Sequence, residues 1–177
     1  MNTSHERRSV LRGHLSGVNC TARPPWALAE ELFVEQCSRC DHCIERCPPG
    51  IIKRGSGGYP EIDFQRGECD FCGECEAACQ SGALSASIRE APWFNHISID
   101  SNRCLPHQGV MCLTCAEQCE VQAIRFLPAL GGISKPRLDS ELCTGCGGCI
   151  ATCPGAAIEM KILDAASQHA ATGEQSR

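Results

Sequence analysis

The chain has 177 residues, a formal net charge of −5 and 17 cysteines, almost one residue in ten. Leu, Ile, Val and Phe together make up 34 residues, about 19% of the chain and less than a soluble domain normally uses to build its core. Disulfides or bound metal must therefore contribute to its stability. The acidic balance excludes an ordinary nucleic-acid-binding protein, because such proteins carry a basic surplus.

The N-terminal segment contains Arg7 and Arg8 followed by a short apolar stretch, which resembles the start of a twin-arginine export signal. An export signal also needs a contiguous apolar segment, whereas residues 12–25 are mostly polar, basic or proline. We therefore interpret residues 1–31 as a basic arm that includes the start of a helix, and we expect a cytoplasmic protein. No uncharged apolar run approaches the roughly 18 residues of a membrane span.

Sixteen of the cysteines fall into four groups of four along the chain. The groups are Cys37, Cys40, Cys43 and Cys47; Cys69, Cys72, Cys75 and Cys79; Cys104, Cys112, Cys115 and Cys119; and Cys143, Cys146, Cys149 and Cys153. Three groups have the spacing C-x2-C-x2-C-x3-C. The third group is irregular because its first cysteine lies five residues upstream, which makes residues 105–111 an insertion. Cys20 lies outside every group, and we expect it to bind no metal.

The spacing favours iron–sulfur clusters over zinc or disulfides. A structural zinc site usually takes two ligands from one short loop and two from a distant one. Three cysteines at successive steps of three instead surround three corners of a [4Fe-4S] cluster, and the fourth cysteine binds the cluster of the partner motif. Cysteines so close in one loop rarely pair with each other, and in a cytosolic chain this pattern favours metal. The sequence therefore predicts four [4Fe-4S] clusters.

Crossing of the fourth cysteine between neighbouring motifs predicts four ligand sets. The first set is Cys37, Cys40, Cys43 and Cys79; the second is Cys69, Cys72, Cys75 and Cys47; the third is Cys104, Cys112, Cys115 and Cys153; the fourth is Cys143, Cys146, Cys149 and Cys119. The assignment is weakest for the irregular third motif. Exchange of partners between the two halves of the chain stays open.

A wider repeat surrounds the cysteines and predicts an α+β fold of two tandem, bacterial-ferredoxin-like two-cluster units. An apolar residue and an aspartate precede three motifs, and a small or apolar pair follows every motif. Each repeat is thus a short strand, a cysteine loop, a helical turn and a second short strand. We predict units at 32–93 and 94–164, a helix over 27–36 with its apolar face at Ala27, Leu28, Leu32 and Phe33, and a disordered tail at 165–177.

No constellation for acid–base or nucleophilic catalysis is evident, so we do not expect an enzyme. His42 and His107 lie near cysteines, where a histidine either tunes a cluster or simply faces solvent. Gly55-Ser56-Gly57-Gly58 is followed by no Lys-Ser or Lys-Thr pair, which favours a turn between strands over a phosphate loop. Because each ligated cluster adds about −2, four clusters would bring the net charge to about −13. Arg7, Arg8, Arg12 and Arg23 keep the arm positive, as in a docking element or a merely solvated segment.

Several features together resemble the NapF family of ferredoxin-type accessory proteins of periplasmic nitrate reductase systems. They are Arg7-Arg8, Arg23-Pro24-Pro25-Trp26, Gly57-Gly58-Tyr59-Pro60, the stretched third motif, and Cys143-Thr144-Gly145-Cys146-Gly147-Gly148-Cys149. The resemblance implies a cytoplasmic protein that contacts the catalytic subunit of the periplasmic nitrate reductase before export. It implies a role in maturation of that subunit, including the loading of its iron–sulfur cluster. The alternative is a ferredoxin or subunit that passes electrons to a redox enzyme, since cysteine ligands alone do not fix a reduction potential.

Overall fold

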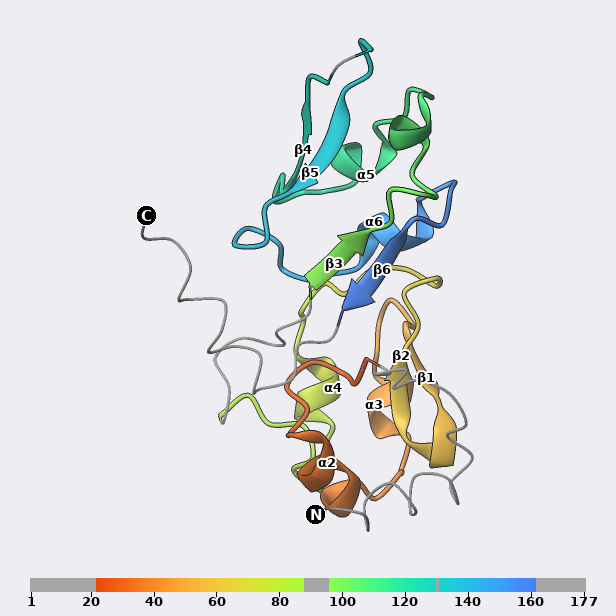
Figure 1. The fold of residues 1–177 in the computed structure, drawn as a ribbon. Helices are drawn as coiled ribbons and strands as arrows, with labels where there is room; N and C mark the ends of the chain where they lie inside the picture. Colours follow the sequence, from red (N-terminus) through yellow and green to blue (C-terminus); the bar gives the residue numbers. More distant parts are fainter. Residues whose placement is uncertain (1–21, 88–95, 130, 162–177) are drawn as a thin grey trace, which may run out of the picture.

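The computed structural model describes residues 22–87, 96–129 and 131–161, and within them the fold is a mixture of short helices and small sheets, as predicted (Figure 1). The first half contains α2 (Glu30–Gln36), α3 (His42–Glu45), β1 (Ile52–Arg54), the 3-10 turn η1 (Ser56–Gly58), β2 (Pro60–Ile62) and α4 (Glu74–Ala77). The second half contains β3 (His96–Ile99), the 3-10 turn η2 (Leu105–Gln108), α5 (Thr114–Glu117), β4 (Ile124–Leu127), β5 (Lys135–Leu138), α6 (Gly148–Ala151) and β6 (Ile158–Lys161). No helix in these three ranges has the length and apolar character needed to cross a membrane.

The strands form three antiparallel pairs, two of which occupy equivalent places in the two halves. The strands β1 and β2 form a hairpin in which Ile52 lies opposite Ile62, and β4 and β5 form its counterpart, with Ile124 opposite Leu138. The turn η1 connects β1 to β2, and Gly57 adopts a positive φ of 65° there. This confirms the predicted turn, because a positive φ is accessible to glycine at little steric cost.

The third pair joins the first and last strands of the second half, with Ile99 of β3 opposite Ile158 of β6. In the first half a short extended segment takes the place of β3. Ala27 makes an isolated antiparallel bridge with Leu84, and the amide of Leu28 donates a hydrogen bond of 3.1 Å to the carbonyl of Ala83. Each half is therefore closed by pairing of its beginning with its end.

This pairing corrects the predicted helix over residues 27–36. The helix begins at Glu30 rather than Ala27, because the backbone on either side of Ala27 is committed to the bridge with Leu84. Phe33 is fully buried, as its helical spacing predicts, but Leu32 is 50% exposed. The prediction that Leu32 lies on the apolar face was wrong, since a helix of only seven residues presents a narrow buried stripe.

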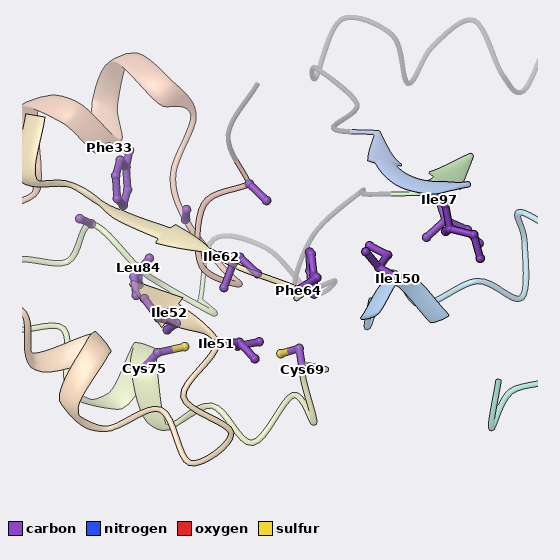
Figure 2. Close-up of a cluster of buried hydrophobic side chains, with 14 of the residues drawn as sticks. Phe33, Ile51, Ile52, Ile62, Phe64, Cys69, Cys75, Leu84, Ile97 and Ile150 are labelled. Atoms are coloured by element: carbon purple, nitrogen blue, oxygen red, sulfur yellow. The ribbon is translucent and has the colours of Figure 1, made fainter. Parts of the chain in front are cut away.

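The core is small and extends through both halves. Its members include Phe33, Ile52 and Ile62 from the first half and Ile97 and Ile150 from the second. Figure 2 shows Phe64 between the side chains of the first half and Ile150 of α6. Among the described residues, Phe33 and Phe64 are the aromatic members of this buried core and the rest are aliphatic side chains or cysteines, in keeping with the limited apolar content of the composition.

Arg23 ties the N-terminal segment to this core. Its guanidinium donates hydrogen bonds of 3.0 and 2.7 Å to the carboxylate of Glu30 and one of 3.2 Å to the carbonyl of Pro60. Its Cζ atom lies 5.0 Å from the ring centroid of Phe33 and 5.5 Å from that of Tyr59, within range of a cation–π interaction. Of the two readings of the arm, a docking element or a solvated segment, the position of Arg23 favours attachment to the first half, whereas Arg7, Arg8 and Arg12 lie outside the described residues.

We predict that Arg23→Lys lowers the stability of the iron-loaded protein by about 1–2 kcal/mol. A lysine cannot reproduce both the two-pronged contact with Glu30 and the stacking over two rings. Thermal unfolding followed by circular dichroism measures the change. Arg125→Lys, at an exposed position of β4, is the matched control, and an equal shift in both variants would contradict the assignment.

Candidate iron–sulfur centres

Left-handed backbone at two positions bends three of the four cysteine loops. The positions are the second residue after the first cysteine and the residue directly after the second cysteine: Arg39 and Asp41, Phe71 and Gly73, Gly145 and Gly147. In each loop the second of these residues caps the following helix, α3, α4 or α6. In these three motifs, the chain therefore forms a tight loop between the first and second cysteines and then begins the short helix that carries the third cysteine.

The third motif achieves its bend differently, because of its insertion. Leu113, which corresponds to Asp41, has a φ of −125° rather than a positive value. The turn η2 within the insertion ends at Gly109, whose φ is 88°. Cys104 begins this turn and is buried despite its displacement along the sequence. The extra turn η2 therefore accommodates the five-residue displacement of Cys104 along the sequence.

A main-chain hydrogen bond repeated four times holds each loop against its partner. The fourth residue after the last cysteine of every motif is at most 1% exposed, and its carbonyl accepts an amide N–H from the segment that leads into the partner motif. The donor–acceptor pairs are Asp63 to Ile51 (2.7 Å), Leu28 to Ala83 (3.1 Å), Asp139 to Ala123 (2.7 Å) and Asp100 to Ala157 (2.7 Å). Motifs one and two are connected reciprocally in this way, and so are motifs three and four.

The repeated aspartates also start the loops. An Oδ1 atom of each accepts the amide N–H two residues later, with distances of 3.1 Å for Asp63, 2.9 Å for Asp100 and 3.1 Å for Asp139. A contact with Lys53 lowers the pKa of Asp63, and the Asn102 amide lowers that of Asp100. An aspartate suits this position because its backbone amide binds the partner motif, while its short side chain accepts a hydrogen bond from the backbone of its own turn.

Two cavities are each lined by four cysteines from two motifs. One cavity is lined by Cys47 together with Cys69, Cys72 and Cys75. The second is lined by Cys153 together with Cys104, Cys112 and Cys115. These groups coincide with the second and third ligand sets, including the irregular motif. The fourth cysteine thus lies with the partner motif and not with its own.

The thiols whose charges act on two half-buried cysteines indicate which cysteines of the remaining sets are neighbours. Burial raises the pKa of Cys43 to about 11, and the thiols that add to this shift are Cys37, Cys79 and Cys40. These are the four members of the first set. Burial raises the pKa of Cys149 to about 12, with further contributions from Cys146, Cys143 and Cys115. Three members of the fourth set therefore lie together, and Cys119 stays a predicted ligand.

Backbone amides point at three of the four crossing cysteines. Leu84 donates to Cys79 Sγ at 3.4 Å, Ala123 to Cys119 Sγ at 3.3 Å, and Ala157 to Cys153 Sγ at 3.3 Å. Such N–H···S bonds orient a thiolate and help to set the reduction potential of a cluster. In these three motifs, the short segment after the last cysteine therefore makes two contacts. Its carbonyl binds the amide that leads into the partner motif, and its amide binds the sulfur of the last cysteine.

The donor sets fit a [4Fe-4S] cluster in softness and in spacing. Burial raises the pKa values of Cys69 and Cys75 to about 12, so iron must displace their protons on binding. In the described ranges no group of three or more Cys, His, Asp or Glu side chains is close enough to hold one metal ion. Four thiols that come from two motifs and line one cavity instead suit a multinuclear cluster.

His42 and His107 act on neighbouring cysteines through their backbone amides. The His42 amide is the main cause of a lowered pKa at Cys40, and the His107 amide opposes the effect of burial at Cys104. Any residue other than proline supplies such an amide, so these contacts do not require an imidazole. Cys20 lies outside the described residues.

Comparison with known proteins agrees with this geometry. Residues 36–84 and 110–157 each match the 4Fe-4S dicluster domain family, so the chain is a tandem dicluster ferredoxin. Over 165 residues, 93% of this chain and 99% of its relative, it is 41% identical to the ferredoxin-type protein NapF of Escherichia coli K12. It is 37% identical to NapF of Haemophilus influenzae over 89% of this chain and 94% of that protein. The ferredoxin-type protein NapG of E. coli K12 is 31% identical over 74% of this chain and 65% of its own length.

The chain belongs to the NapF family of ferredoxin-type proteins. This confirms the resemblance drawn from the arginine pair, the Pro-Pro-Trp segment and the stretched third motif. The tandem dicluster architecture also confirms that the repeats come in pairs.

Trp26 offers a direct test of the crossing, because it lines the cavity formed by Cys47, Cys69, Cys72 and Cys75. The chain has one other tryptophan, Trp93, so a Trp93→Phe protein reports on Trp26 alone. We predict that cluster loading quenches Trp26 fluorescence and that Cys47→Ala restores most of it. Cys40→Ala, from the same motif, is the matched control and should leave the quenching in place. If the motifs did not cross, Cys40 and Cys47 would bind the same cluster, so equal fluorescence in the two variants would contradict the assignment.

Proposed function

We propose that this protein is a cytoplasmic accessory protein that binds four [4Fe-4S] clusters and assists maturation of the periplasmic nitrate reductase catalytic subunit before its export. The proposed ligands are the sixteen cysteines of the four sets: Cys37, Cys40, Cys43, Cys79; Cys69, Cys72, Cys75, Cys47; Cys104, Cys112, Cys115, Cys153; and Cys143, Cys146, Cys149, Cys119. The observation that carries the proposal is the pair of cavities lined by crossed cysteine quartets in a chain of the NapF family.

The residues of the chain have separate tasks in this proposal. A bound cluster supplies iron, sulfide and one-electron redox chemistry. The buried thiols hold the clusters, and the amides of Leu84, Ala123 and Ala157 fix the crossing sulfurs. Cys40 and Cys72 are exposed, so the first two clusters would each reach the surface at one corner, where a partner protein can approach.

We further propose that the chain is organised as an arm at residues 1–31, two-cluster units at 32–93 and 94–164, and a tail at 165–177. The contacts of Arg23 and Ala27 support attachment of the end of the arm to the first unit. No enzymatic reaction is assigned to the chain, in keeping with relatives that are named ferredoxin-type proteins.

The second candidate function is electron transfer to a redox enzyme. The same exposed cysteines favour it, because a cluster at the surface can exchange electrons with a docked partner. Both candidates need loaded clusters, and they differ in whether the partner's own cluster content depends on this protein.

The thin core leads to a prediction about iron removal. The apo chain lacks the apolar burial needed to offset its conformational entropy, and its buried cysteines would enclose empty cavities. We therefore expect chelation of iron to abolish most of the ordered structure, measured by far-ultraviolet circular dichroism. An apo protein with a native-like spectrum and a cooperative melt would contradict this.

The maturation proposal is tested in the partner. We expect the nitrate reductase catalytic subunit, isolated before export, to lack iron and sulfide when cells lack this protein. Wild-type protein supplied from a plasmid should restore the content, whereas a Cys72→Ala variant serves as the cluster-deficient control. A subunit that is fully loaded without this protein would overturn the role in loading and favour electron transfer.

A further inference from the structure

The two halves meet through the backbone of two predicted cluster ligands. The amide of Cys69, in the second motif, donates a hydrogen bond of 2.9 Å to the carbonyl of Cys146, in the fourth. Cys69 is only 9% exposed, so the contact is shielded from solvent. Beside it, Gln118 Nε2 donates to Glu68 Oε2 at 3.4 Å, which links the segment before Cys69 to the residue that directly follows α5 in the second half.

Two consecutive glycines allow this close approach. A Cβ on Gly147 would overlap the ring of Phe64, and a Cβ on Gly148 would overlap the carboxylate of Glu68. Phe64 is 7% exposed and belongs to the shared core, and in Figure 2 it lies between Cys69 and Ile150. A larger residue at 147 would therefore push Phe64 away or open the junction.

Gly73 shows that the glycine at 147 does more than supply a backbone conformation. It occupies the same place in the second motif, with a φ of 79° against 82° for Gly147. Nothing lies within 4 Å of a Cβ built on Gly73. The backbone requirement is therefore shared by both glycines, and the steric requirement belongs to Gly147.

Within each half, helices bring two ligand sets together. The helices α3 and α4, which carry Cys43 and Cys75, pack against each other, and the charge of Cys43 acts on Cys75. The helices α5 and α6, which carry Cys115 and Cys149, form the equivalent contact. The first set thus adjoins the second, and the third adjoins the fourth.

We propose that the four clusters form one continuous series in the order first, second, fourth, third, in which the Cys69–Cys146 hydrogen bond is the link between the halves. Phe64 and Gly147 are the positioning residues that hold this link closed. The inference rests on the proposed binding of four clusters. It replaces two independent pairs with one array whose ends are the first set and the irregular third set.

The second and fourth sets are connected by a short path of covalent bonds that contains one hydrogen bond. It runs from Cys69 Sγ along the side chain and backbone to its amide, across one hydrogen bond, and through the Cys146 carbonyl to Cys146 Sγ. With clusters bound, this path would carry one electron from one cluster to its neighbour, with no bond formed or broken. A partner protein that met the first or second cluster at the exposed Cys40 or Cys72 would then exchange electrons with the whole array.

The experiment compares Gly147→Ala with Gly73→Ala in the iron-loaded protein. Both substitutions introduce a Cβ at a left-handed residue, but only the first meets Phe64. Hydrogen exchange by mass spectrometry reports on the peptide that contains Cys69, and electron paramagnetic resonance of the reduced protein reports on magnetic interaction between clusters. We expect Gly147→Ala to speed exchange at Cys69 about tenfold and to remove part of the interaction broadening, whereas Gly73→Ala leaves both unchanged.

The double variant Phe64→Leu/Gly147→Ala should recover slow exchange and broadening, because leucine keeps an apolar side chain at the junction and makes room for the new Cβ. If Gly147→Ala loses iron, recovery of iron in the double variant supports the proposal and equal loss overturns it. Unchanged exchange and unchanged spectra in Gly147→Ala would also overturn it. Iron analysis comes first: fewer than about sixteen iron atoms in the wild-type protein would count against the four-cluster proposal itself, whatever the variants show.

Discussion

The structure depends on one main-chain hydrogen bond that occurs four times. In each repeat, a buried carbonyl four residues after the last cysteine accepts an amide from the start of the partner motif, as in Asp63 to Ile51 and Asp100 to Ala157. Because the bonds are reciprocal, neither motif of a pair can take its shape without the other. In the described structure, Cys47, Cys79 and Cys153 accordingly lie beside cysteines of their partner motifs. It also explains why so small a core is sufficient, since the pairing and the clusters share the task of holding the chain.

Three of the six described non-glycine residues with positive φ lie in the cysteine loops, where ligation can compensate for backbone strain. Arg39, Asp41 and Phe71 adopt positive φ values, although residues with a side chain normally avoid that region at a cost of about 1 kcal/mol or more. The fourth motif has glycines at the same two positions, Gly145 and Gly147. The loops thus reach one geometry from different sequences, and the pattern follows the centre that they surround rather than local preference.

Both halves pair the beginning of their chain segment with its end, but they do so with different secondary structure. The second half closes with a pair of regular strands, β3 and β6, whereas the first closes with the bridge between Ala27 and Leu84. That bridge makes the Arg23-Pro24-Pro25-Trp26 segment part of the first half: Arg23 binds the core and Trp26 lines a cysteine cavity. From residue 22 onward, the segment predicted as an N-terminal arm therefore packs into the first half of the fold.

Sequence alone determined that this protein is an iron–sulfur protein of the ferredoxin type. The spacing of its sixteen grouped cysteines predicts the ligands and favours pairing between adjacent motifs, because a loop of three-residue steps can surround only part of a cluster. The repeated aspartates and the apolar pairs predict the strands on either side. These features are local and periodic, so they can be read without coordinates, and the family resemblance rests on similar short motifs.

Only the tertiary structure decided where the two halves contact each other and which side chains lie in that contact. The start of α2 at Glu30, the exposure of Leu32 and the capture of Arg23 all depend on contacts with residues distant in sequence. The contact between Cys69 and Cys146, and the fit of Phe64 over Gly147, join motifs that no spacing connects. Spacing fixes what one loop can bind, but the order of the binding sites in space depends on how two separately paired units pack.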